Sequence, residues 1–400
     1  MTTPSLDQRL LLVHYAEIGL KRGHRVSFER RLRDRLTEGL RHAGIETGAS
    51  YVGRRYVIPI PSADLIGRAL DVVRRIPGVA NVQPAYAVPS DLDAIRVAAA
   101  RALQEAEPGS FKVETRRSFK AFPLNSIQVS QAVAPACLEA TSRPVDVHHP
   151  DVTVRVEIMR DTTYVSAGRV PGAGGLPVGS TSRLLSFLSG GIDSAVATWL
   201  MIRRGARVTA VHFHNRTHEG DAVLEKLEDT CGVLAWSAGQ MPLLVVPFEA
   251  CQRALVATVP AEYRMILYRR AMFRIATALA ARERALGYVT GDSLGQVASQ
   301  TAENLRTIHA AADLPVYTPL AGSDKTEIVE RARQIGTFEI SIRPHADCCS
   351  FLIAPHPAVR STVDEAEGYE QGVDWKALVA EAVEGTERIV YSPDPSVLAG

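Results

Sequence analysis

Residues 189–194, with the sequence Ser-Gly-Gly-Ile-Asp-Ser, have the composition of an anion-binding loop. An apolar run, 184–188, precedes them, and residues 195–204 are expected to form a helix. A helix that begins directly after glycines points unpaired backbone N–H groups and the positive end of its dipole at the loop. The glycines let an anion approach the backbone, and the two serines add hydroxyl donors. This stretch therefore predicts a phosphate site.

Asp193 adds a second requirement, because a carboxylate inside a phosphate site repels the ligand unless a cation lies between them. The residue thus implies Mg²⁺. The Walker spacing with its lysine is absent, so this is not a Walker loop. A plain serine-glycine turn in front of a helix is the alternative.

Three further stretches carry polar or aromatic groups near expected strand ends. His212 and Phe213 end the run 207–213, where a ring could bracket an adenine. Residues 291–300 follow the run 288–290 and are expected to turn into a helix N-terminus. Lys325 lies on the first turn of a helix opened by an Asp324–Glu327 capping box. A cation gains nothing from the dipole there, so charge compensation at a polyphosphate or plain solvation must explain it.

Short β-type runs alternate with helical segments through this part of the chain, at 184–188, 207–213, 243–248 and 288–290. The longest helical segment is 261–286. Such alternation predicts a parallel α/β sheet with right-handed crossovers, whose ligands bind at the carboxyl ends of the strands.

The front half has a different pattern, typical of α+β structure. A strand at 10–14 precedes a helix that Ser27 is expected to cap, and 152–158 with 163–167 predicts a hairpin. The run 111–117 alternates like a strand and is basic and aromatic. Because phosphates are bound by basic side chains and unpaired bases stack on aromatic rings, it predicts an RNA-facing edge; an ordinary half-exposed strand is the alternative. Residues 118–120 continue this basic and aromatic character, and the residues expected at the RNA-facing edge are Lys112, Arg116, Arg117, Phe119 and Lys120.

Composition limits the class of protein. Four hundred residues suit two or three domains, and a net charge of +1 confines any nucleic-acid surface to a local patch. No apolar run is long enough to span a membrane and no signal-peptide core opens the chain, so we expect a cytoplasmic protein without a membrane partner. The five cysteines, two adjacent at 348 and 349, do not form a disulfide scaffold.

Residues 189–194 resemble the pyrophosphate loop of the PP-loop ATP pyrophosphatases. Together with 14–28, 172–179, 291–300 and 323–340 they resemble the tRNA 4-thiouridine synthetases, or tRNA sulfurtransferases, over about residues 10–360. The resemblance implies an α/β fold in which a PP-loop domain with a parallel, Rossmann-like sheet (170–400) follows ferredoxin-like (1–63) and THUMP (64–169) α+β domains. It also implies the reaction: ATP adenylates C4 of uridine 8 in tRNA, and a persulfide sulfur then displaces AMP to give 4-thiouridine.

The same resemblance implies roles for individual residues. Asp193 would hold Mg²⁺, and Lys325 would assist adenylation. Arg269 and Arg270 lie in an apolar helix, where a buried charge needs a partner, and an ATP phosphate would serve. The residues implied in ATP binding are Phe187, Leu188, Ser189, Gly190, Gly191, Ser194, His212, Phe213, Arg269, Gly291 and Gln300.

The sulfur must come from a thiol, and the family pattern favours Cys349, with Cys348 as the second choice. Arg343 or His345 nearby would favour the reactive thiolate. Cys137, Cys231 and Cys251 are expected in the core. Longer family members carry a rhodanese-like domain, for which we expect no room before Gly400. Sulfur would then pass directly from a cysteine desulfurase, with Cys348 or Cys231 resolving the disulfide, and no role in thiazole synthesis is expected.

Three alternatives stay open. Some short members use an iron–sulfur cluster; Cys231, Cys348 and Cys349 are the available ligands, but adjacent cysteines chelate one centre poorly and no C-x-x-C is present. Another PP-loop adenylating enzyme would leave the basic front half unexplained. A non-catalytic tRNA-binding protein would need a broken loop or no thiol.

The resemblance also implies a homodimer.

Overall fold

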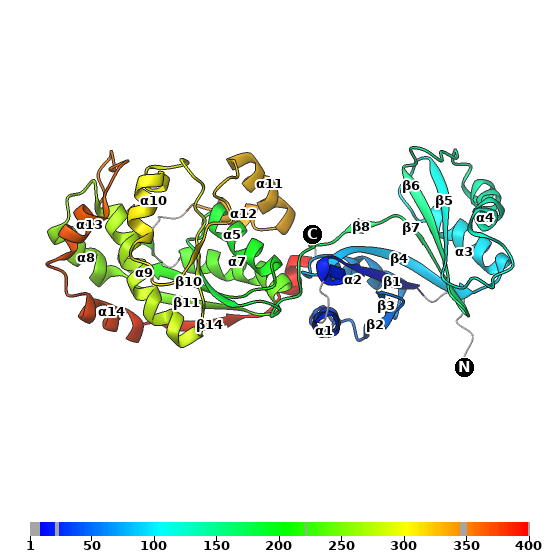
Figure 1. The fold of residues 1–400 in the computed structure, drawn as a ribbon, viewed down its shortest axis with the longest axis horizontal. Coiled ribbons are helices and arrows are strands. Elements are labelled where there is room, and N and C mark those ends of the chain that lie inside the picture. Colours follow the sequence, from blue (N-terminus) through cyan, green and yellow to red (C-terminus); the bar gives the residue numbers. More distant parts are fainter. Residues whose placement is uncertain (1–8, 21–23, 221, 345–349, 399–400) are drawn as a thin grey trace. The chain divides into compact units, whose positions relative to one another are not determined.

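The computed structural model describes residues 9–20, 24–220, 222–344 and 350–398. The chain divides into two compact units, Met1–Leu176 and Pro177–Gly400, each with its own sheet (Figure 1). We call them unit 1 and unit 2. Among the described residues, no helix is both long enough and apolar enough to cross a bilayer.

Unit 1 is built on one sheet with the order β2-β3-β1-β4-β7-β6-β5, and β8 pairs with β4. Neighbouring strands are antiparallel except β5 and β6, which run parallel. The strands are β1 (Arg9–Tyr15), β2 (Ser50–Val52), β3 (Arg55–Pro59), β4 (Val79–Pro89), β5 (Phe111–Arg117), β6 (Val152–Ile158), β7 (Thr162–Ala167) and β8 (Val170–Pro171).

The helices of unit 1 cover its sheet in two groups. α3 and α4 bury the inward side chains of β5–β7 in one hydrophobic cluster, while α2 packs on β1 and β4. These elements are η1 (Glu17–Leu20), α1 (Arg25–His42), η2 (Ala63–Leu65), α2 (Ile66–Arg74), α3 (Leu92–Gln104) and α4 (Ser126–Thr141). The expected cap at Ser27 is wrong, because α1 begins two residues earlier and His24 is its N-cap.

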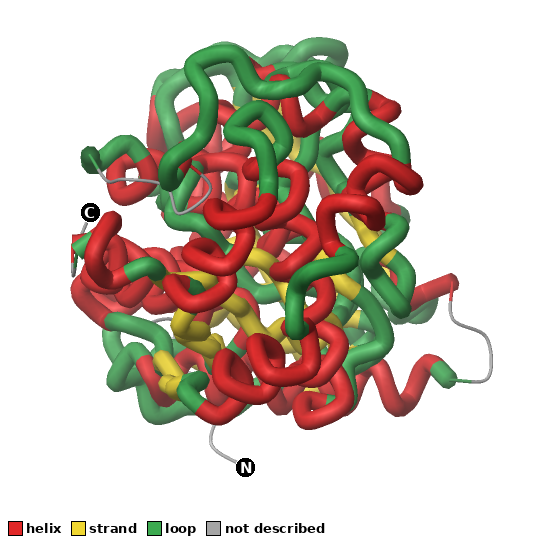
Figure 2. The backbone as a smooth tube through the Cα atoms, turned by 90° about the vertical axis from the view of Figure 1, so that its left-hand side faces the viewer, coloured by secondary structure: helices red, strands yellow, loops and turns green. Residues whose placement is uncertain are grey.

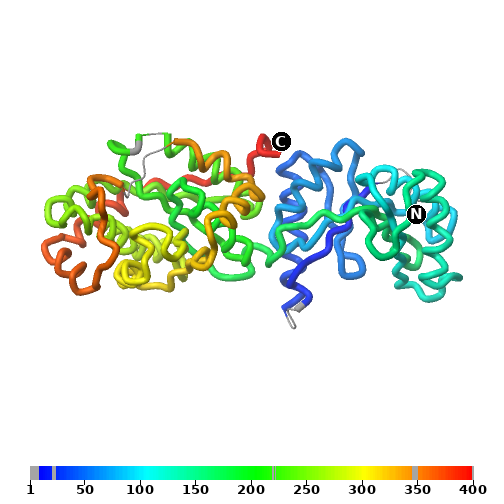
Figure 3. The backbone as a smooth tube through the Cα atoms, turned by 90° about the horizontal axis from the view of Figure 1, so that it is seen from above, coloured from blue at the N-terminus to red at the C-terminus, as the bar shows by residue number. Residues whose placement is uncertain are grey.

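Unit 2 contains a sheet with the order β13-β12-β9-β10-β11-β14. All pairs are parallel except β11 with β14, and β14, near the C-terminus, returns to the edge beside β11 (Figure 3). The strands are β9 (Arg183–Phe187), β10 (Arg207–His214), β11 (Met241–Pro247), β12 (Tyr288–Val289), β13 (Val316–Tyr317) and β14 (Glu387–Tyr391). The expected parallel α/β sheet is confirmed.

Helices pack on these strands, α5 and α9 on β9 and α7 on β11; Figure 2 draws helices in red and strands in yellow. The long helix α9 is buried along most of its length and packs on Leu185 and Val211 of the sheet. The helices are α5 (Ile192–Arg203), α6 (Arg216–Glu219), α7 (Ala222–Ala238), α8 (Glu249–Thr258), α9 (Arg264–Glu283), η3 (Ala298–Gln300), α10 (Ala302–His309), α11 (Lys325–Ile335), α12 (Phe338–Ser341), α13 (Val363–Glu370), α14 (Trp375–Glu384) and η5 (Pro395–Leu398).

One expectation about unit 2 is wrong. Gly291 does not turn directly into a helix: residues 291–297 form a loop, η3 follows, and α10 begins only at Ala302, capped by the Thr301 hydroxyl. The loop stays irregular because its side chains contact neighbouring elements, as described below.

Candidate active site

The loop between β9 and α5 is held in shape by its own serines. Ser194 Oγ accepts a hydrogen bond from the Ser189 amide (3.2 Å) and donates to the Gly191 carbonyl (3.0 Å). Gly190 has φ = 85°, in the left-handed region that favours glycine. Gly191 is the N-cap of α5, so no side chain caps the first turn of this helix. The expected serine donors therefore bond within the loop, and the helix N-terminus opens toward a cavity.

This cavity has a volume of about 410 Å³, within the range of small-molecule sites. Of the eleven residues expected to bind ATP, ten line it, together with Asp193; Gly190 is the exception. Sequence reasoning missed eight further lining residues: Val211, Met265, Met272, Thr290, Asp292, Gln296, Val297 and Ser299. The spacing of Met265, Arg269 and Met272 along one helix face was a signal for two of them.

Aromatic rings form one wall of the cavity. The ring of Phe187 packs edge-on against Phe213, with centroids 5.5 Å apart, and lies 5.0 Å from Phe273. His212 Nδ1 is 2.9 Å from the Leu188 carbonyl. Since a carbonyl only accepts, Nδ1 carries the proton, and His212 fixes the backbone at the start of the loop.

Asp193 joins three elements at the mouth of the cavity. Lys325 Nζ, on the first turn of α11, donates to its Oδ1 (2.6 Å), and Gln296 Nε2 donates to its Oδ2 (3.1 Å). The expected capping box of Asp324 and Glu327 is present at the start of α11. The carboxylate is thus already neutralised by one ammonium.

Gly291 brings the loop that follows β12 close to α5. A Cβ at this position would lie 2.8 Å from the Ser194 amide nitrogen and 2.9 Å from the Asp193 carbonyl carbon. Only glycine allows this approach, which places Asp292 and Gln296 on the cavity wall.

Arg269 reaches into the cavity and finds a carboxylate there. Its Nη2 donates to Asp292 Oδ2 (2.7 Å), and the Thr290 hydroxyl donates to the same oxygen (2.7 Å). Burial alone would raise the pKa of Asp292, but Arg269 together with hydrogen bonds from His309 and Thr290 holds this pKa below its ordinary value. Asp292 is therefore ionised in the buried wall.

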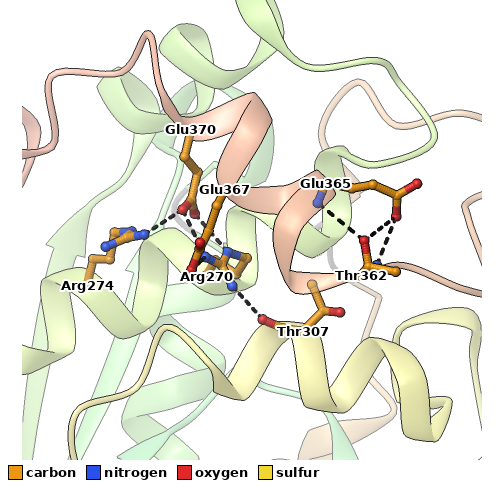
Figure 4. A network of polar contacts seen from close by, with 7 residues as sticks. All are labelled: Arg270, Arg274, Thr307, Thr362, Glu365, Glu367 and Glu370. Atoms are coloured by element: carbon orange, nitrogen blue, oxygen red, sulfur yellow. Dashed lines mark hydrogen bonds and ion pairs between the residues drawn. The ribbon is translucent and has the colours of Figure 1, made fainter.

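Arg270 does not contact the cavity ion pair, and the expectation that an ATP phosphate partners it is wrong. Its Nε and Nη2 donate to both carboxylate oxygens of Glu370 (2.8 and 2.9 Å), and its Nη1 donates to the Thr307 carbonyl (Figure 4). Arg274 also donates to Glu370. This buried network joins α9, α10 and α13, and sequence alone gave no reason to match residue 270 with residue 370.

The carboxylates at the cavity can bind Mg²⁺ only together with a ligand that supplies further oxygen atoms. The described residues contain no group of three His, Cys, Asp or Glu side chains that could hold a metal ion. Asp292 is engaged by Arg269, which leaves Asp193 as the carboxylate at the mouth. One carboxylate plus substrate phosphates is an ordinary arrangement for Mg²⁺, so the residues fit an ion that arrives with a nucleotide.

Both expected sulfur-carrying thiols, Cys348 and Cys349, lie outside the described residues, as does His345. Cys137, Cys231 and Cys251 are buried as expected, and burial raises the pKa of each thiol, to about 11, 12 and 12 respectively. Such thiols are poor nucleophiles and poor metal ligands, which weakens the case for Cys231.

The expected RNA-facing residues lie on β5, which is an edge strand of the sheet in unit 1, and just after it. Lys112 and Arg116 share one face of the strand, while Phe111 and Val113 pack on the opposite, helix-covered face. Arg116 and Lys120 are exposed, whereas Arg117 donates to the carbonyls of residues 120 and 122, and Phe119 packs partly against the core.

Three family models match the chain: the ThiI ferredoxin-like domain at residues 10–82, the THUMP domain at 89–167, and thiamine biosynthesis protein (ThiI) at 179–375. The chain is 40% identical to a "Probable tRNA sulfurtransferase" of Moorella thermoacetica, over 97% of this chain and 99% of that protein. One from Halothermothrix orenii is 37% identical over 95% and 98%.

A solved structure is similar over the same length. It is that of a 4-thiouridine synthetase in complex with RNA and with bound ATP, and it matches with a TM-score of 0.87 and 34% identity. The match covers 96% of this chain and 100% of that one.

Proposed function

Because this chain belongs to the tRNA sulfurtransferase family, whose activity is the ATP-dependent thiolation of tRNA, we propose that the cavity in unit 2 holds ATP for the adenylation of uridine 8. The observation that carries the proposal is that residues of the loop between β9 and α5, Arg269 of α9 and residues of the stretch 290–300 line one cavity. The aromatic side suits the base and the N-terminus of α5 suits the phosphates.

In the first step, the C4 oxygen of the uracil attacks the α-phosphorus of ATP, and the bond to the β-phosphate oxygen breaks. Negative charge builds on the departing pyrophosphate. The start of α5 lines the cavity, and the Lys325 ammonium contacts Asp193 there; the backbone N–H groups of α5 and this ammonium would stabilise the charge. Arg269, held by Asp292, adds a fixed positive group.

Asp193 would hold Mg²⁺ together with the phosphates, and the ion would supply further charge neutralisation. For this, Lys325 must share or leave its contact with Oδ1. A triphosphate offers Lys325 an alternative acceptor, so the two cations need not compete.

In the second step, we propose that the terminal sulfur of a persulfide on Cys349 attacks C4. A C–S bond forms, the C4–O bond to the adenylate breaks and AMP leaves. A second thiol, Cys348, then attacks the remaining disulfide, which releases 4-thiouridine and leaves an enzyme disulfide for an external thiol to reduce. An iron–sulfur cluster ranks second, because Cys231 is fully buried.

The partners complete the proposal. A cysteine desulfurase would supply the persulfide in the cytoplasm, and a homodimer would present tRNA held by the β5 edge to the cavity. The domain boundaries expected at residues 63/64 and 169/170 belong to the same proposal.

Single-turnover assays on Cys349→Ser and Cys348→Ser test the sulfur assignment. With ATP and unmodified tRNA, Cys349→Ser should release pyrophosphate at the wild-type rate and form no 4-thiouridine. Normal thiolation by Cys349→Ser, with loss in Cys348→Ser, would reverse the assignment; normal thiolation in both would end the persulfide proposal.

A further inference from the structure

The loop after Gly291 supplies the exposed part of the cavity lining. Of the described residues that line the cavity, only Gln296 and Val297 are exposed, and Val297 keeps 51% of its surface accessible. Leu294, in the same loop, is 59% exposed. A reactant too large to enter the cavity whole must therefore reach into it past these side chains.

Hydrogen bonds hold this loop against the segment that leads into α11. The Ser293 hydroxyl donates to the Ser323 carbonyl (2.9 Å), and the Leu294 amide donates to the Ala321 carbonyl (3.2 Å). The exposed side chains are thus presented by a backbone whose position is already fixed, which lowers the entropic cost of binding a partner.

The loop offers apolar groups and no charge. Residues 293–302 include no acidic or basic side chain, so they do not provide the cations that bind RNA phosphates. Exposed aliphatic side chains instead suit the face of an unpaired base, because enzymes that modify a base hold it against aromatic or apolar side chains once it has left the stack. These features favour a base, rather than the RNA backbone, as the occupant.

Asp193 fixes the orientation of the Gln296 amide. Since a carboxylate only accepts hydrogen bonds, Gln296 Nε2 is the atom that faces Asp193 Oδ2 (3.1 Å), and Oε1 is the acceptor on the other side of the amide. Uracil carries a hydrogen on N3, whereas cytosine does not. An acceptor at this position therefore matches uracil.

We propose that Leu294, Gln296 and Val297 form the subsite for the uracil base that is adenylated. Leu294 and Val297 pack on the face of the base, and Gln296 Oε1 accepts its N3–H. The C4 oxygen is attached next to N3, so the same contact orients the reacting oxygen. The inference rests on the proposed function, because it takes the cavity to hold the ATP with which the uridine reacts.

Photo-crosslinking tests this contact without depending on turnover. 4-Thiouridine reacts with neighbouring side chains under near-ultraviolet light, so tRNA that carries it at position 8 reports what touches the base. With the full-length protein and ATP, we expect a crosslink within residues 294–297, mapped by mass spectrometry. A crosslink confined to other segments, or none at all, would overturn the inference.

Variants of the loop test the same contacts by rate. Leu294→Ala combined with Val297→Ala should leave the affinity for ATP within about twofold of wild type and slow single-turnover pyrophosphate release with tRNA about tenfold. Gln296→Met keeps the length of the side chain but not its amide, and should slow this release at least about tenfold. Leu286→Ala and Gln334→Met, which change an exposed leucine and an exposed glutamine outside the cavity, are the matched controls.

Pyrophosphate release at the wild-type rate in both loop variants would overturn the inference. A loss of ATP affinity as large as the loss of rate would also overturn it, since the loop would then bind the nucleotide. Asp193→Asn, assayed alongside, distinguishes the two levels of the argument. If Asp193→Asn releases pyrophosphate at the full rate, the proposed function and the inference fall together; if it is inactive while both loop variants are normal, only the inference falls.

Discussion

The Lys325 ammonium lies 2.6 Å from Asp193 Oδ1, although the two residues stand on the first turns of different helices, α11 and α5. A cation on a first turn is disfavoured by the helix dipole, so a specific partner must offset the cost. Asp193 is that partner, and it also lines the cavity in which we propose that the phosphates bind.

Asp193→Asn and Lys325→Met should each slow pyrophosphate release by about 100-fold or more, because each removes a charge aimed at the reacting phosphates. The affinity for tRNA should stay within about twofold, since the expected RNA-facing strand belongs to unit 1. Glu330→Gln, an exposed site on the same helix as Lys325, is the control. Full pyrophosphate release by Asp193→Asn would remove Asp193 from the site.

The Arg269–Asp292 pair predicts a stability effect. Arg269→Met leaves a carboxylate in the buried wall without its guanidinium, which should cost about 3–5 kcal/mol in the free energy of unfolding. Asp292→Asn added to it should recover most of this stability but not ATP binding. Tryptophan fluorescence during denaturant unfolding reports this, because Trp199, Trp236 and Trp375 all lie in unit 2. A double variant as unstable as Arg269→Met would contradict the argument.

Short sequence patterns were enough to predict many of the strands and helix starts of unit 2. Apolar runs gave its central parallel strands, and the Asp324–Glu327 spacing gave the start of α11. Partners distant in sequence could not be read in the same way. The match of Arg270 with Glu370 follows from how α13 packs on α9, and β14 pairs with β11 although little in the last residues distinguishes a strand.

In the cavity, too, only the residues near strand ends could be predicted from the sequence. The glycines and aromatic residues at the ends of β9, β10 and β12 were expected there, and ten of the eleven residues expected to bind ATP line the cavity. Gln296 was missed because its contact with Asp193 depends on the irregular loop after Gly291, which was expected to turn into a helix.

The open face of β5 predicts a graded effect on RNA binding. Lys112→Ala and Arg116→Ala should each weaken tRNA binding roughly fivefold and lower the slope of log K against log salt by about one. Arg117→Ala should do less, because two backbone carbonyls already hold its guanidinium. Filter binding across a salt series measures this, and equal effects for all three variants would contradict the assignment of faces.

His14 of unit 1 predicts a pH dependence of folding. Burial, followed by the charges of Arg55, Arg169, Arg155 and Arg116, lowers its pKa from 6.5 to about 4. Between these values the unfolded chain binds a proton that the folded protein does not, so stability falls as pH drops from 6.5 to 4. After a discount for partial exposure, the loss is about 1–2 kcal/mol.

His14→Gln should remove that part of the acid dependence. Circular dichroism during urea unfolding at pH 7 and pH 5 measures it, since the tryptophans do not report on unit 1. An identical loss of stability in the variant and in the wild type would show that other groups are responsible.

The proposed function requires that the cavity presents the α-phosphorus of ATP to an RNA oxygen. Product analysis with ATP labelled at the γ-phosphate and unmodified tRNA distinguishes this reaction from transfer of the γ-phosphate. We expect the label in pyrophosphate, with AMP and 4-thiouridine formed in equal amounts. Label in orthophosphate, with ADP as the second product, would show that the γ-phosphorus is attacked instead.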